Sequence, residues 1–82
     1  MNYAIYRTID GKHPHIIHRF TQAACNHKAK RAATEKLNEM WLRIIDRPDY
    51  YQNAIGSDTE FSYDHPTSTC TSQHIRFYID KI

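Results

Sequence analysis

The stretch ATEKLNEMWLRII, residues 33–45, repeats its apolar side chains at the spacing of an α-helix. They fall at i, i+4, i+7, i+8, i+11 and i+12, on one helical face: Ala33, Leu37, Met40, Trp41, Ile44 and Ile45. Upstream, Thr21 is of the residue type that caps helix N-termini, and downstream Pro48 cannot continue a helix. The sequence therefore predicts one amphipathic helix over residues 22–46.

A hairpin pattern precedes this helix. Residues 3–9 (YAIYRTI) and 15–20 (HIIHRF) are rich in β-branched and aromatic side chains, as strands are. Asp10-Gly11 between them predicts a tight turn, because both residues accept a positive φ. Pro14 has no N–H to donate, so the second strand either lies at a sheet edge or follows a longer turn that ends at Pro14.

Two further strands follow the helix. Residues 59–64 and 74–80 alternate between polar and apolar side chains, and a polar loop joins them. The order β-β-α-β-β predicts an α+β fold, a four-stranded antiparallel sheet with one amphipathic helix packed on one face, as a single domain over residues 1–82. The expected core is Tyr3, Ile5, Ile16, Ala33, Leu37, Met40, Trp41, Ile44, Phe61, Tyr63, Ile75, Phe77 and Ile79.

The composition of the chain excludes several classes of protein function. A chain of 82 residues is too short for a second domain, and its two glycines exclude a glycine-rich phosphate loop. The net charge is +2, with nine basic and four acidic side chains in residues 1–47 against two and five in residues 48–82. Cys25 and Cys70 make no disulfide framework, and the first residues enter a strand pattern without a signal peptide. We expect a cytoplasmic protein with free thiols and no membrane contact.

Alternation along the strands also predicts a candidate binding surface on the sheet face that the helix leaves uncovered. It consists of Tyr6, His15, Arg19, His74, Arg76 and Tyr78. Aromatic rings mixed with arginine on an open sheet stack single-stranded nucleic acid in several folds. Tyrosine and arginine are equally enriched at protein interfaces, and an ordinary solvated sheet face can carry them too. The residue pattern leaves these three interpretations open.

A second candidate surface is the flank of the helix formed by Lys36, Arg43 and Arg47. Basic side chains in a row grip phosphates or an acidic protein surface. Glu39 and Asp46 on the same helix dilute this charge, so a solvated outer face is the competing interpretation.

The histidines suggest a metal site or a nuclease. In a strand, His13 and His15 would point one way and His18 the other, and the chain has no CxxC pair, so we expect neither metal nor cofactor. The His13-Pro14-His15 segment resembles the HUH element of single-strand nucleases, which implies a tyrosine nucleophile at Tyr50 or Tyr51. Pro14 departs from the bulky apolar residue usual in that element.

The layout of the chain carries one more resemblance. It starts a strand at Asn2-Tyr3-Ala4-Ile5-Tyr6, and its helix contains Ala29-Lys30-Arg31-Ala32-Ala33. In these features and in length it resembles the small phage-encoded anti-CRISPR proteins. The resemblance implies a non-enzymatic inhibitor in the host cytoplasm that blocks the nucleic-acid-binding surface of a CRISPR effector complex. The net charge of +2 departs from the acidic DNA mimics of that group, so direct docking on protein is expected. A single-stranded nucleic-acid-binding domain is the alternative, and a metal-dependent nuclease is the third reading.

Overall fold

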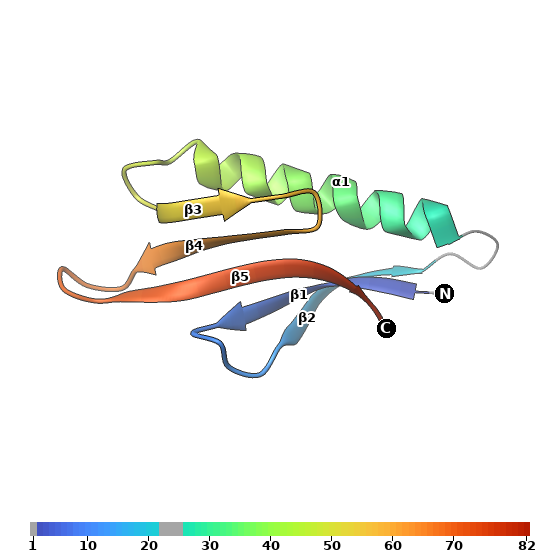
Figure 1. Cartoon of the computed structure of the whole chain (residues 1–82), viewed down its shortest axis with the longest axis horizontal. Helices are drawn as coiled ribbons and strands as arrows, with labels where there is room; N and C mark the ends of the chain where they lie inside the picture. The colour runs from blue at the N-terminus through green and yellow to red at the C-terminus, as the bar shows by residue number, and fades with distance from the viewer. Residues whose placement is uncertain (1, 22–25) are drawn as a thin grey trace.

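The computed structural model describes residues 2–21 and 26–82, and in these ranges the chain forms one helix against an antiparallel sheet (Figure 1). In chain order the elements are β1 (Asn2–Ile9), β2 (His15–Thr21), α1 (Asn26–Ile45), β3 (Gln52–Gly56), β4 (Glu60–Pro66) and β5 (Ser72–Lys81). The strands lie in the order β2-β1-β5-β4-β3, with antiparallel neighbours throughout. The predicted α+β class is confirmed, but the sheet has five strands where four were predicted.

The additional strand is β3, which forms an edge of the sheet beside β4. All five of its residues are exposed, so it has no apolar side that an alternating pattern would reveal. Its pairing is irregular: Gln52 pairs with Asp64 and Ile55 with Ser62, and Asn53 between them takes a φ of 54°. Backbone pairing with β4, which the sequence pattern does not display, makes this segment a strand.

The turn between β1 and β2 forms as predicted. Asp10 and Gly11 have φ values of 53° and 72°, and the Lys12 amide donates to the Ile9 carbonyl over 3.0 Å. A turn with two positive φ values matches the right-handed twist of the paired strands. Strand β2 begins only at His15 and lies at the other edge of the sheet, so both expectations based on Pro14 hold.

Strand β2 carries a β-bulge that changes which side chains face the helix. Ile5 pairs with His18, but the next residue, Tyr6, pairs with Ile16, so Ile17 is the extra residue. Cross-strand partners share a face of the sheet, which puts Ile16 on the side of Tyr6. Ile17 packs against the core in its place. The prediction that Ile16 belongs to the core was therefore wrong.

The core lies between α1 and the sheet. Its buried cluster joins two helical residues to five strand residues: Leu37, Ile44, Ile5, Phe61, Tyr63, Ile75 and Phe77. Burying a side chain of this size contributes about 2 kcal/mol relative to leaving it in water. Met40, Trp41 and Ile79 pack against this cluster, and Ala33 is buried, as predicted. Tyr3 is only half-buried and lies outside the cluster.

Two boundaries of the predicted helix can be compared with the structure. The helix ends at Ile45, one residue before the predicted end, and Arg47 follows it in the connection to β3. Thr21, the predicted cap, is the last residue of β2, and the predicted start at residue 22 lies outside the described residues. Of the two cysteines, Cys70 is an exposed free thiol, and Cys25 also lies outside the described residues.

Candidate functional site

On the open face, meaning the side of the sheet turned away from α1, three of the predicted binding residues lie next to one another. Alternation along β1 turns Tyr6 to this side, because its neighbour Ile5 is buried in the core. The same alternation turns Arg76 and Tyr78 of β5 there, on either side of buried Phe77. Tyr6 and Tyr78 are direct cross-strand partners, so their rings are adjacent.

These three side chains form one stacked group. The rings of Tyr6 and Tyr78 lie 5.3 Å apart between centroids with an angle of 13° between their planes. The guanidinium carbon of Arg76 lies 4.4 Å from the centroid of the Tyr78 ring, a cation–π distance. Tyr78 therefore engages both neighbours with its ring surface, and the group is ordered before any partner arrives.

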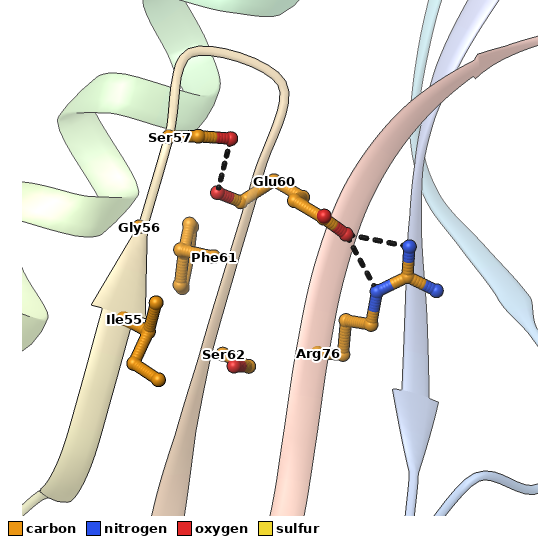
Figure 2. Close-up of a pocket in the computed structure, with 7 residues that line it drawn as sticks. All are labelled: Ile55, Gly56, Ser57, Glu60, Phe61, Ser62 and Arg76. Carbon is orange, nitrogen blue, oxygen red and sulfur yellow. Dashed lines mark hydrogen bonds and ion pairs between the residues drawn. The ribbon is translucent and has the colours of Figure 1, made fainter.

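Glu60 of β4 holds Arg76 in this position. The Arg76 Nε donates to Glu60 Oε2 over 2.7 Å, and Nη2 of the same guanidinium contacts the same oxygen (Figure 2). Both side chains are about half exposed, so the pair contributes roughly 0–1 kcal/mol to stability. Its larger effect is electrostatic, because the carboxylate neutralises the charge of Arg76.

A shallow hollow of about 190 Å³ adjoins this group across β3, β4 and β5 (Figure 2). Arg76 and Glu60 form one wall, and Ile55 of β3 contributes to the opposite wall. Ile55 is 71% exposed, so it adds apolar area to the surface beside the ion pair. The open face thus combines rings, a neutral ion pair and an exposed apolar side chain in one continuous area.

The other end of the open face contains a hydrogen-bonded triad. His74 Nδ1 lies 3.0 Å from Asp64 Oδ1, and Asn53 Nδ2 donates to Asp64 Oδ2 over 2.7 Å. The Asn53 and His74 hydrogen bonds hold the pKa of the Asp64 carboxyl below its ordinary value. The stabilisation from this shift is present above the ordinary aspartate pKa and is lost as the pH falls through the lowered one. The triad links β3, β4 and β5.

The other two predicted strand residues, Arg19 and His15, lie apart from the stacked group. Arg19 pairs with Ala4, which places it on the open face but on the outer strand β2. His15 pairs with Arg7, the residue after Tyr6, so it lies on the opposite face from Tyr6. The bulge at Ile17 is the physical reason, since one extra residue reverses the alternation on which the prediction was based.

The predicted basic flank of α1 is partly neutralised. Glu39 lies between its two helical members, with an oxygen 3.7 Å from Lys36 Nζ and 3.2 Å from Arg43 Nη2. Arg47 lies beyond the helix and lines a separate hollow with Arg43 and Tyr51. Glu39 therefore interrupts the predicted cationic row between Lys36 and Arg43, whereas Arg43 and Arg47 lie beside the same hollow.

The histidines take a different arrangement from the one predicted. His15 and His18 share a face, because the bulge reverses the alternation between them, whereas the sequence analysis had them diverge. The rings of His13 and His15 lie 6.1 Å apart. In the described ranges no group of three histidine, cysteine or acidic residues has a geometry able to hold a metal ion. Tyr50 and Tyr51 lie against another histidine, His65 of β4.

Sequence reasoning missed Glu60, Asp64 and Ile55. Alternation along β4 does turn Glu60 and Asp64 away from the core, but only the strand register shows that they meet Arg76 and His74. Ile55 belongs to the strand that was not predicted.

No helix within the described ranges is long and apolar enough to cross a membrane.

No protein-family model matches the chain, and neither a curated protein nor a solved structure matches it.

Proposed function

We propose that this chain is a non-enzymatic binding protein that docks on a protein partner through the open face. The observation that carries the proposal is the stacked group of Tyr6, Tyr78 and Arg76, fixed by Glu60. Tyrosine and arginine are the side chains that most often dominate binding energy at protein interfaces. A group that is already ordered loses little conformational entropy on binding, which favours affinity.

The charge of this group favours a protein over nucleic acid as the partner. Affinity for nucleic acid depends on cations that are free to neutralise phosphates, and Arg76 is already paired with Glu60. Stacking of a base needs free ring surface, and the Tyr78 ring already contacts Tyr6 and Arg76. The exposed Ile55 beside the group adds apolar area of the kind that protein interfaces bury.

The resemblance to phage-encoded anti-CRISPR proteins supplies the first partner to test. On this proposal the chain inhibits a CRISPR effector complex by covering the surface that binds nucleic acid. Purified effector complexes, each with guide RNA, are immobilised and binding of the chain is measured by biolayer interferometry. The measurement is repeated with a sample of the protein that has been treated with nuclease to remove bound nucleic acid. Binding that disappears after this treatment favours the nucleic-acid-binding alternative.

Two ring variants give the decisive comparison. Tyr78→Ala and Tyr6→Ala are each expected to weaken binding by about 2 kcal/mol, roughly thirtyfold, as for an interface anchor. Tyr50→Ala is the matched control, because Tyr50 is 46% exposed and belongs to the connection between α1 and β3 instead of the open face. Circular dichroism confirms folding of all three. Equal binding by Tyr78→Ala, Tyr6→Ala and wild type contradicts docking through the open face.

A further inference from the structure

Arg7 of β1 is placed unlike the other arginines of the chain. Five of the six arginines are exposed, whereas Arg7 is partly buried. It pairs with Phe77 of the core cluster, so it projects from the face opposite to the open face. Its neighbours two residues away along β1, Ile5 and Ile9, belong to the core or pack against it. A guanidinium is thus held beside the apolar side of the sheet.

Within the part of the chain that the structure describes, this guanidinium has no counter-ion. Among the described residues, the ion pairs of arginine involve Arg43 and Arg76, and neither an ion pair nor a hydrogen bond involves the Arg7 side chain. A partly buried charge without a partner is costly, because it has lost part of its hydration and gained nothing in exchange. An anion brought from solution removes that cost, and an exposed arginine gains much less from one.

The Arg7 side chain is also held in place. Its Nε atom is buried and has no hydrogen-bond partner, which shows that the inner part of the guanidinium is packed against the protein. The two terminal nitrogens of the guanidinium are not buried without a partner in this way. They therefore remain available to donate hydrogen bonds to a ligand. A fixed pair of terminal N–H groups matches the two oxygens of a carboxylate or phosphate.

Two further donors lie in the same region. His15 is the direct cross-strand partner of Arg7 on β2. Burial raises the pKa of the Tyr63 phenol, the nearby Tyr51 raises it further, and the positive charge of Arg7 lowers it. Arg7 and Tyr63 share one region on the helix side of the sheet, because the Tyr63 ring lies 6.3 Å from the ring of Phe77, the cross-strand partner of Arg7. The Tyr51 ring lies 4.8 Å from the Tyr63 ring between centroids.

We propose that Arg7, with the Tyr63 hydroxyl and the His15 ring as neighbouring donors, forms a binding site for a small oxyanion, a carboxylate or phosphate group. The partly buried and uncompensated guanidinium carries the inference. The site is on the opposite face of the sheet from Tyr6 and Tyr78, so it stands independently of docking through the open face.

Nuclear magnetic resonance tests this on the intact chain. The buried Arg7 Nε–H gives its own signal, and sodium acetate and inorganic phosphate are titrated at pH 7 in separate arms. Sodium chloride at matched ionic strength is the third arm. A saturable shift of the Arg7 signal with acetate, phosphate or both supports the site, and the responding arm identifies the group. Shifts no larger than those with chloride overturn it.

Variants check the assignment. Arg7→Met keeps the length and the packing of the side chain and is expected to weaken oxyanion binding by about tenfold or more. The matched control is Arg19→Met, on the neighbouring strand, which is expected to bind like wild type. Thermal unfolding gives a second readout: the oxyanion raises the Tm of wild type and Arg19→Met more than that of Arg7→Met. If Arg7→Met does not fold, Arg7→Lys, which retains one positive charge, replaces it and is expected to bind more weakly than wild type. Unchanged binding by the Arg7 variant overturns the site.

Discussion

At the scale of single residues, Trp41 packs so closely on Gly56 that no side chain fits at position 56. The indole ring of Trp41 on α1 lies over the backbone of Gly56 at the end of β3, and it also packs on Phe61 at 5.4 Å between centroids. A Cβ atom at position 56 would lie 2.7 Å from the Trp41 Cε2 atom, closer than real Cβ contacts allow. The sequence pattern does not reveal this role of Gly56, because it depends on a contact between segments that are distant in the chain.

Gly56→Ala tests this contact. The added methyl group must displace the indole or the β3 backbone, so the free energy of unfolding is expected to fall by about 1–3 kcal/mol, as overpacking does elsewhere. Urea denaturation followed by circular dichroism measures the loss. In a Trp41→Leu background the same alanine is expected to cost less, since the clashing ring is gone. An equal cost in both backgrounds would show that the clash is not the cause.

At the scale of elements, helix α1 and strands β1, β4 and β5 were predictable because each buries one side and so repeats its apolar residues. Strand β3 was not, because every residue in it is exposed and its existence depends on pairing with β4. The candidate site likewise has a part that the sequence predicts and a part that it does not. Alternation alone placed Tyr6, Arg76 and Tyr78 on one face, while the neutralisation by Glu60 needed the register.

The bulge in β2 makes a prediction for that element. Ile17 packs against the core and Ile16 lies on the side of Tyr6, although both are partly buried isoleucines. Ile17→Ala is expected to lower the free energy of unfolding by about 2 kcal/mol, and Ile16→Ala by less than about 1 kcal/mol. Chemical denaturation of the two variants in parallel measures the difference. Regular alternation without a bulge would reverse the order, so an equal or larger loss in Ile16→Ala contradicts the observed register.

At the scale of the whole molecule, the chain is a thin body of 49 × 26 × 14 Å, and helix α1 runs along its long axis (Figure 1). The helix contacts β1, β2, β5 and β3, so it touches both edge strands as well as the centre of the sheet. One buried cluster includes side chains from α1, β1, β4 and β5. No group of strands therefore has a core of its own to fold around.

This connectivity predicts that the chain unfolds in one cooperative transition, as most small single domains do. Trp41 is the single tryptophan, and its fluorescence reports on the contact of α1 with β3 and β4. Far-ultraviolet circular dichroism reports on the secondary structure of the helix and of all the strands together. During urea denaturation the two signals are expected to share one midpoint and one slope, because loss of the helix removes the cover from the whole core. An earlier fluorescence transition would mean that edge strand β3 detaches by itself, which would leave Ile55 and the hollow beside Arg76 without a fixed wall.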